Sequence, residues 1–267
     1  MATGSRWLSI VTVVKDDPTG LARTLESIVV QDCVGAELVV VDSSSDESSV
    51  PSMLQGRVRQ DSCPVTYRHE PPRGIYPAMN SGLASAQGEY VLFLNAGDAF
   101  DASHVVASLS ALVERESPAW LVGRVRVVGP SGPDTVSATW DYRTERKRSF
   151  ARGLFPPHQG TVARRELLNR AGGFDTTYAI AADYAMALRL STFADPTMTE
   201  LVIARFVEGG VSTQRWKESF REFHRARREI CRPTGVASLR EQWDTQVHFA
   251  RVFAYREVLS RLSRGAR

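Results

Sequence analysis

Short apolar runs rich in β-branched residues alternate with helical patterns through the first half of this chain. The runs are residues 9–14, 37–41, 65–69, 90–94 and 120–128. Helical spacing lies between them, after the Asp17-Pro18 start signal and at residues 75–86 and 102–115. Apolar strands separated by helices imply a mostly parallel sheet with helices on both faces. The alternation therefore predicts an α/β fold.

Polar residues follow three of these predicted strands directly. They occupy residues 15–17, 42–46 and 95–98. In open α/β sheets, ligands bind outside the carboxyl ends of the strands. The three segments therefore indicate a ligand site, although polar loops at strand ends are also expected without one.

The remainder of the chain carries looser helical patterns and a basic tail. We expect helices at residues 164–170, 181–190, 216–230 and 239–262. From Arg215 onward there are 13 basic and 6 acidic residues, a net charge of +7, which leaves −4 for the rest of a chain with formal charge +3. Basic amphipathic helices can lie on anionic membranes, but they can also pack on the body of the protein or form a dimer contact. No nucleic-acid motif accompanies the charge, so we expect no nucleic-acid partner.

Cysteine content and hydropathy narrow the class of protein further. The three cysteines (Cys33, Cys63 and Cys231) are far apart and show no CxxC spacing, which argues against a disulfide scaffold or a zinc site. No signal peptide is visible, and the apolar runs are much shorter than the ~20 residues of a membrane span. We therefore expect a cytoplasmic protein that is at most peripheral at the inner face of the membrane.

Five sequence blocks, in this order, carry a family resemblance. They are SIVTVVKDDPTGLARTLESI, ELVVVDSSSDES, GIYPAMNSGLASAQGEYVLFLNAGD, PHQGTVARRELLNRAGGFD and YAIAADYAMALRL. Over residues 7–192 the chain resembles family 2 glycosyltransferases with the GT-A fold. The resemblance implies a GT-A domain over residues 1–212, followed by a helical extension over residues 213–267. The domain's nucleotide-sugar half would end near residue 100 and its acceptor half near residue 212.

The same resemblance implies a hexosyltransferase-type enzyme that inverts the sugar's anomeric centre. It would move the sugar from a nucleotide-sugar donor to a hydroxyl of a sugar or lipid-linked acceptor, as in bacterial cell-envelope or glycolipid synthesis. Such a displacement needs one general base and charge stabilisation for the departing diphosphate. Asp183 matches the family's base position, and the N-terminal dipole of its helix would favour the charged form. The alternative is that Asp183 only caps this helix.

Residues 95–98 stand where the family has its DxD metal motif. Asn95 and Gly97 replace two of the acids, so Asp98 alone keeps a carboxylate. We expect Asp98 to bind Mg²⁺ or Mn²⁺, since Mg²⁺ commonly uses one or two carboxylates together with phosphates and water. The alternative is that Asp98 only caps the following helix.

The resemblance also assigns contacts to the two substrates. The expected donor-binding residues are Thr12, Val14, Asp16, Asp42, Arg73, Asn80, Asn95 and Ala96. The expected acceptor-binding residues are His158, Gln159 and Asp175. Four simpler roles stay open: a loop cap for Asp42, a solvated surface for Arg73, a structural histidine at 158 and a turn closed by Asp175.

Two other functions remain compatible with these patterns. One is a sugar-phosphate nucleotidyltransferase, against which the chain lacks a glycine-rich, lysine-containing loop after the first strand. The other is a non-catalytic nucleotide-sugar-binding or membrane-scaffold module, which the reduced metal motif favours. The nucleotide, the sugar and the acceptor are not encoded by any of these motifs.

Overall fold

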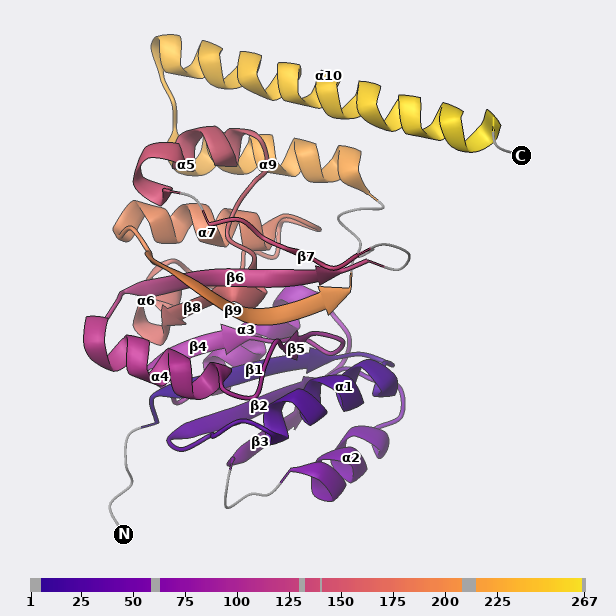
Figure 1. The fold of residues 1–267 in the computed structure, drawn as a ribbon, viewed down its shortest axis with the longest axis vertical. Helices are drawn as coiled ribbons and strands as arrows, with labels where there is room; N and C mark the ends of the chain where they lie inside the picture. Colours follow the sequence, from indigo (N-terminus) through magenta and orange to yellow (C-terminus); the bar gives the residue numbers. More distant parts are fainter. Residues whose placement is uncertain (1–5, 59–62, 130–132, 140, 208–214, 266–267) are drawn as a thin grey trace.

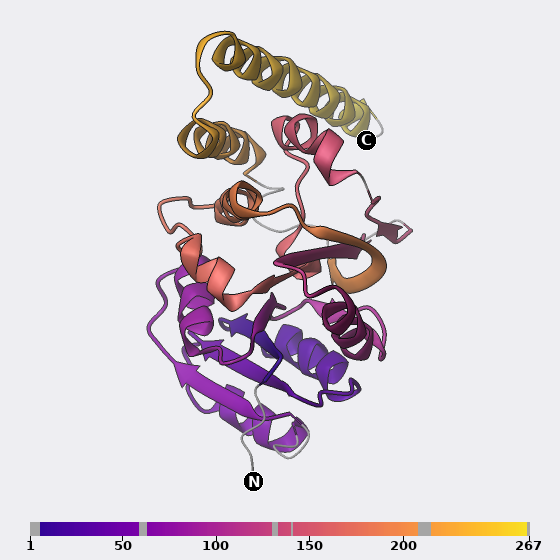
Figure 2. The same cartoon turned by 90° about the vertical axis from the view of Figure 1, so that its left-hand side faces the viewer.

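The computed structural model describes residues 6–58, 63–129, 133–139, 141–207 and 215–265, with side chains up to residue 254. One mixed sheet of nine strands runs across the middle of this part of the molecule. Helices cover both of its faces, and the C-terminal helices are stacked above it (Figures 1 and 2). The predicted α/β fold is confirmed.

The first half of the sheet is parallel, as the alternation predicts. Its strands are β1 (Leu8–Val14), β2 (Ala36–Asp42), β3 (Val65–His69) and β4 (Tyr90–Phe93). They lie in the order β3-β2-β1-β4, and the register pairs Val14 with Asp42 at the carboxyl ends of β1 and β2. Every residue of β1, β2 and β4 is buried, which explains their continuous apolar runs.

The second half of the sheet is mixed, which corrects the expectation of a mostly parallel sheet. It contains β5 (Ala99–Phe100), β6 (Trp120–Val128), β7 (Thr135–Val136), β8 (Thr161–Arg164) and β9 (Thr197–Val207). Strand β8 lies antiparallel between β4 and β6, whereas β9 pairs parallel to β6. Strand β8 therefore joins the two halves, beside the end of β4 that carries residues 95–98.

Each face of the sheet has its own hydrophobic core. One face is covered by α1 (Pro18–Val29), α2 (Ser49–Arg57) and α4 (Val105–Glu116). The other is covered by α3 (Ile75–Ser85), α6 (Arg165–Arg170) and α7 (Ala182–Phe193). The predicted start of α1 is confirmed, because Asp17 Oδ1 accepts a hydrogen bond from Gly20 N at 2.8 Å.

The basic tail forms two helices that pack on the body of the protein. They are α9 (Trp216–Cys231), which lies against α7, and α10 (Gly235–Gly265), which crosses above α9 and α5 (Tyr142–Ala151) (Figure 1). Arg227 is buried and donates to Glu241, Thr245, Tyr184 Oη and the Phe150 carbonyl. Part of the tail's positive charge is therefore internal. The expected boundary at residues 212–213 lies outside the described residues.

Helix α10 exposes large apolar side chains. Val236, Leu239 and Trp243 are 80%, 67% and 70% exposed, and they share one side of the helix at i, i+3 and i+7 spacing. Within the described residues, no helix combines the length and apolarity needed to cross a membrane.

Two of the three cysteines lie together, although 30 positions separate them in the sequence. Cys33 and Cys63 are both buried in the core beneath α1 and α2. The side-chain hydrogen bond between them lowers the pKa of Cys33 and, with burial, raises the pKa of Cys63. Both thiols are free.

Candidate active site

The carboxylate of Asp42 is buried where β2 ends. Its Oδ1 accepts from Ser44 N at 2.8 Å, and its Oδ2 accepts from Tyr67 Oη at 3.0 Å. Asp42 therefore organises the loop after β2, which is the simpler of its two expected roles. A contact from Asp42 to the donor stays a prediction.

The end of β1 is tied to the same loop. Asp16 has a left-handed backbone (φ 50°), donates its N–H to Ser44 Oγ and accepts from Ser45 N at 2.7 Å. Thr12 is fully buried and donates to the Leu94 carbonyl, which links β1 to the end of β4. Of the predicted donor residues in this strand and its following loop, Asp16 alone is exposed, while Thr12 and Val14 shape the wall from inside.

The turn over residues 95–98 is clamped by Thr24, a residue that sequence reasoning missed. Gly97 has φ +97° and donates its N–H to Thr24 Oγ1, which in turn donates to the Asp98 carbonyl at 2.6 Å. Asp98 N also donates to the Asn95 carbonyl at 2.9 Å. A threonine on the buried side of α1 therefore sets the shape of the degenerate metal motif, and the only signal for it in the sequence is a polar side chain on the mostly apolar face of the predicted helix.

Asp98 is a buried acid, 9% exposed. Burial raises the pKa of Asp98 to about 6, although the charge of His158 and hydrogen bonds from Gln159 and the Asn95 backbone oppose the rise. Helix α4 begins only at Val105, so Asp98 is not its cap. The structure thus brings the predicted metal ligand together with two predicted acceptor residues.

The donor atoms at this turn suit a hard divalent cation. The side chain of Asn95 points its Nδ2 at His158 Nε2 (3.3 Å) and leaves Oδ1 buried without a hydrogen-bond partner. With the Asp98 carboxylate, the chain offers two oxygen ligands of the kind that Mg²⁺ and Mn²⁺ prefer. Among the described residues, no cluster of three or more His, Cys, Asp or Glu could hold a metal. The remaining ligands would therefore have to come from a diphosphate and water.

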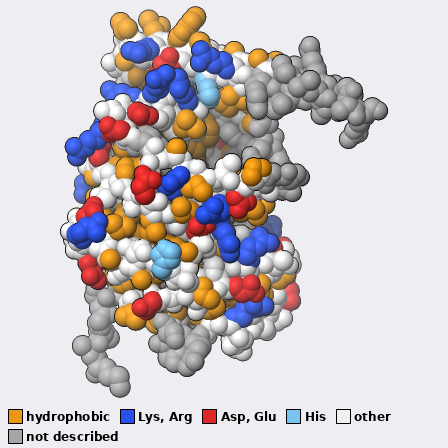
Figure 3. Space-filling view, viewed as in Figure 1, with side chains coloured by type: hydrophobic (Ala, Val, Ile, Leu, Met, Phe, Trp, Pro, Cys, Tyr) orange, Lys and Arg blue, Asp and Glu red, His pale blue; other side chains and the backbone are white. Residues whose placement is uncertain are grey.

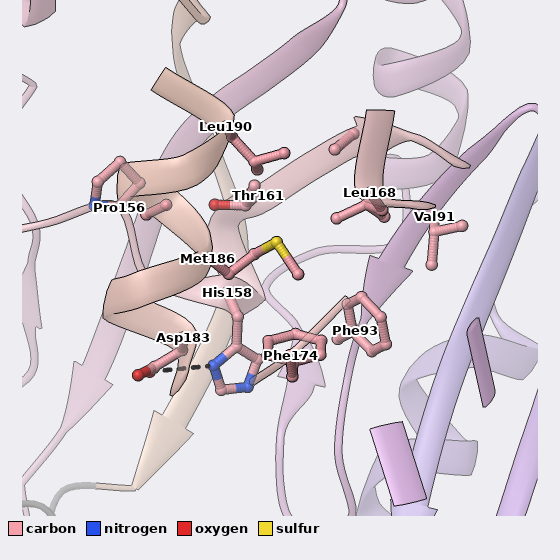
Figure 4. A pocket seen from close by; sticks show the side chains of 12 residues that line it. Val91, Phe93, Pro156, His158, Thr161, Leu168, Phe174, Asp183, Met186 and Leu190 are labelled. Atoms are coloured by element: carbon pink, nitrogen blue, oxygen red, sulfur yellow. Dashed lines mark ion pairs between the residues drawn. The ribbon is translucent and has the colours of Figure 1, made fainter. Parts of the chain in front are cut away.

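Asp183 and His158 face each other across the same site (Figure 4). Asp183 Oδ2 lies 3.7 Å from His158 Nδ1, and both side chains are about one-fifth exposed. Asp183 Oδ1 accepts from Tyr184 N at 2.8 Å. The N-cap of α7 is Ala181, but the bond from Tyr184 N lies in the first turn of α7, so a helix-end role and the role of base both stay predictions for Asp183.

A small cavity lies beside this pair of side chains. Its volume of about 20 Å³ suits a water molecule and not a sugar. Apart from His158, Asp183 and Thr161 its lining is apolar, with Phe93, Phe174, Met186 and Leu190 among its side chains (Figure 4). The apolar side chains that line the cavity lower the local dielectric constant, which strengthens the electrostatic interaction between Asp183 and His158.

Two predicted substrate contacts build the turn before α7 instead. Asn80 uses both ends of its amide on Phe174, donating to the carbonyl at 2.7 Å and accepting from the N–H at 2.8 Å. Gly173, at φ +66°, passes so close that a Cβ there would meet Asn80 Oδ1 at 2.6 Å. Asp175 accepts from Thr177 and pairs with Arg189 at 2.6 Å. Asn80 and Asp175 are therefore engaged internally, and substrate contacts from them stay predictions.

Two predicted donor contacts remain, Arg73 and Ala96. Arg73 is exposed just before α3 and makes no ion pair with any described residue. Ala96 is half-buried, and its N–H donates to the Val13 carbonyl at 3.0 Å. Arg73 thus has a guanidinium that is available to an anion, whereas Ala96 holds the turn after β4 against β1.

Comparison with known proteins identifies the family. The sequence model of glycosyl transferase family 2 matches residues 9–172. An uncharacterized glycosyltransferase of Mycobacterium tuberculosis is 30% identical over 224 residues, which cover 80% of this chain and 79% of that protein. A PGL/p-HBAD biosynthesis glycosyltransferase of the same species is 27% identical over 202 residues, 72% of this chain and 73% of that protein.

Solved structures share the fold at low identity. S. aureus TarS 1–349 in complex with UDP-GlcNAc has a TM-score of 0.66 at 16% identity and covers 93% of this chain and 73% of that one. The mannosyltransferase PcManGT from Pyrobaculum calidifontis, in complex with GDP-Man and Mn²⁺, has a TM-score of 0.63 at 19% identity and covers 99% and 80%. The fold, the family match and the 30% identical relative together establish that this chain belongs to glycosyltransferase family 2 and is a glycosyltransferase with the GT-A fold.

Proposed function

We propose that this glycosyltransferase transfers a sugar from a nucleotide-sugar donor to a hydroxyl acceptor with inversion, and that Asp183 is its general base. The observation that carries this proposal is the meeting of Asp98, His158 and Asp183 at the end of β4 and the start of α7. Asp98 belongs to a buried turn that suits a diphosphate–metal complex. Asp183 is about one-fifth exposed, so a hydroxyl of the acceptor can reach it.

The proposed step is a single in-line displacement. Asp183 takes the proton of the acceptor hydroxyl while the hydroxyl oxygen forms a bond to the anomeric carbon of the sugar. The bond from that carbon to the diphosphate breaks on the opposite side, and the nucleoside diphosphate leaves with the electron pair. His158 lies between the two acids, so its imidazole can orient Asp183 or contact a phosphate oxygen.

Asp98 and Asn95 would hold the divalent metal. When bound, Mg²⁺ or Mn²⁺ neutralises charge that develops on the diphosphate. The chain's own part is to supply the Asp98 carboxylate and the unpartnered Asn95 Oδ1 from a turn that Thr24 keeps in shape. The mannosyltransferase PcManGT, which is similar in fold, was solved with GDP-Man and Mn²⁺, which supports testing Mn²⁺ first.

The nucleotide would lie over the carboxyl ends of β1 and β2. Asp16 is exposed there, and Arg73 offers a positive charge at the rim. Thr12, Val14, Asp42 and Ala96 would act mainly by shaping the wall, because the structure uses their polar groups internally.

The exposed side of α10 favours a lipid-linked acceptor. On the face in Figure 3, basic and hydrophobic side chains gather together at the upper end, over the described part of the C-terminal helices. Val236, Leu239 and Trp243 are exposed beside Arg240, the combination that suits an anionic membrane surface. We propose peripheral membrane association through this side of α10. A relative is named for PGL/p-HBAD biosynthesis, which agrees with an envelope-lipid acceptor.

The test begins with donor class and metal use. Thermal unfolding with UDP, GDP or dTDP, each with and without Mn²⁺, identifies the nucleotide, because a ligand specific to the folded state raises Tm. Transfer from the matching nucleotide-sugar to a membrane-lipid extract is then compared between wild type and Asp183→Asn. We expect the variant to keep nucleotide binding and to lose transfer by about 10²- to 10⁴-fold.

Asp195→Asn is the matched control, because the ion pairs of Asp195 with described residues go to Arg143 and Arg146 of α5. It should leave transfer unchanged. Transfer by Asp183→Asn at the wild-type rate would refute the assigned base. Binding without transfer or donor hydrolysis in the wild type would instead favour the non-catalytic module that the reduced metal motif allows.

A further inference from the structure

Helix α7, which carries Asp183, begins at an N-cap residue that has no capping side chain. Its N-cap residue is Ala181, whose methyl group cannot accept a hydrogen bond. Ile180, Ala181 and Ala182 are all buried. Because a buried helix start leaves backbone N–H groups unpaired, this one needs an acceptor from another part of the chain.

Glu222 of α9 supplies that acceptor. Its Oε1 accepts from Ala179 N at 2.9 Å, and its Oε2 accepts from Ile180 N and Ala181 N at 2.8 Å each. A carboxylate is also the charge that the N-terminus of a helix favours. One side chain of the C-terminal extension therefore binds three backbone N–H groups of the segment that leads into α7.

Other contacts hold the same segment. Tyr184, the residue after Asp183, accepts from the buried Arg227 of α9 at 2.9 Å and donates to a backbone carbonyl of α5. On the α3 side, Tyr76 donates to the Ile180 carbonyl. Asp183 thus lies between anchored residues on both sides, and two of the anchors come from α9.

We propose that Glu222 is a positioning residue for Asp183, so that α9 is part of the catalytic unit. This inference rests on the proposed role of Asp183 as the base. A base must lie within hydrogen-bond reach of the hydroxyl that it deprotonates, and a displacement near 1 Å can lower the rate by about 100-fold. Glu222 makes no hydrogen bond to the residues that form the donor side, so its loss acts on kcat and leaves donor binding intact.

Two variants and one control test the proposal. Glu222→Gln keeps the shape and one acceptor oxygen, whereas Glu222→Ala removes both oxygens. Glu229→Gln is the control on the same helix, because Glu229 accepts from the Tyr178 hydroxyl at 2.6 Å and from no backbone N–H before Asp183. kcat, the KM for the donor and the Kd for the nucleoside diphosphate with Mn²⁺ are measured well below the Tm of each variant.

We expect kcat to fall about 10-fold in Glu222→Gln and about 100-fold in Glu222→Ala, with KM and Kd within about 2-fold of wild type. Glu229→Gln should keep kcat. If Glu222→Ala does not fold, the conservative Gln variant decides alone. An unchanged kcat with a lowered Tm would overturn the proposal in favour of a stability role, and a parallel rise in donor KM and Kd would overturn it in favour of a collapsed donor site.

Asp183→Asn separates this inference from the proposed function. If that variant loses transfer while Glu222→Gln keeps wild-type kcat, the base stands and the role of Glu222 is refuted. If Asp183→Asn keeps wild-type transfer, the base itself is wrong, and the positioning role is refuted with it.

Discussion

Replacing Asp98 by Asn should stabilise the metal-free protein at neutral pH, although it removes the proposed metal ligand. Burial raises the pKa of Asp98 from the ordinary 3.8 to about 6. Keeping this carboxylate ionised in the folded protein at neutral pH therefore costs about 3 kcal/mol. An amide has nearly the same shape and carries no charge, so Asp98→Asn removes that cost.

The pH dependence has a definite sign. A group whose pKa is higher in the folded than in the unfolded state stabilises the fold at acid pH, and this contribution is lost as the pH rises through the folded pKa. For Asp98 the loss runs from about pH 4 to just above pH 6. The free energy of unfolding of Asp98→Asn should thus match wild type near pH 4 and exceed it by about 3 kcal/mol above pH 7, a rise in Tm on the order of 5 to 10 °C.

Thermal or urea unfolding in excess chelator, at one pH on each side of that window, measures the difference. Asp46→Asn is the control, because hydrogen bonds from Ser48 lower the pKa of the exposed Asp46, so its loss should destabilise the protein at neutral pH. Equal stability of Asp98→Asn and wild type at neutral pH would refute the reasoning. So would a gain of the same size at both pH values.

Adding Mn²⁺ with the matching nucleoside diphosphate should make wild type more stable than Asp98→Asn. If the ionised form of Asp98 binds the metal as proposed, Mn²⁺ should raise the Tm of wild type by mass action. Asp98→Asn should gain much less. An equal gain in both proteins would exclude Asp98 as a metal ligand.

Three further substitutions test other parts of the structure. Thr24→Val leaves Gly97 N without its acceptor, so it should lower the free energy of unfolding by about 1–3 kcal/mol in urea and weaken Mn²⁺-dependent nucleotide binding. Unchanged nucleotide binding would contradict the role of Thr24 in holding the turn over residues 95–98. Asn80→Ala removes both hydrogen bonds to Phe174 and should lower the free energy of unfolding by about 2 kcal/mol, whereas Ser85→Ala on the same helix should change it little. Trp243→Glu, on exposed α10, should abolish sedimentation with anionic phospholipid vesicles without changing Tm, and retained sedimentation would exclude that side of α10 as the membrane contact.

Local patterns predicted strands β1, β2 and β4 well because these strands are short, buried and continuous. The Asp17-Pro18 start of α1 and the polar ends of β1, β2 and β4 lie as the sequence indicates. Strand β9 escaped prediction because its run, TMTELVIARFV, carries polar residues, although Asp195-Pro196 marks the break after α7. Helix α5 escaped because its mostly charged sequence has no apolar periodicity.

The acceptor side of the site depends on contacts between residues that are distant in the sequence. Asp183 and His158 could be singled out from motifs, but their 3.7 Å approach could not. Asn80 is assigned to the donor from its place in the GIYPAMN block, and nothing local in the sequence points to its partner in the structure, Phe174. Glu222 looked like any charged residue on a helix surface, since its three backbone partners precede it by more than 40 positions.

Because α9 follows α7 in the chain, it is synthesised after the helix that it holds in place. A ribosome delivers β1 to β4 first, before the strands and helices that follow them in the chain. The segment before Asp183 emerges later but meets Glu222 only after α9 has left the exit tunnel. A nascent chain that lacks α9 would therefore carry Asp183 without the carboxylate that holds the segment before it, so under the proposed roles its transfer rate should rise when α9 docks.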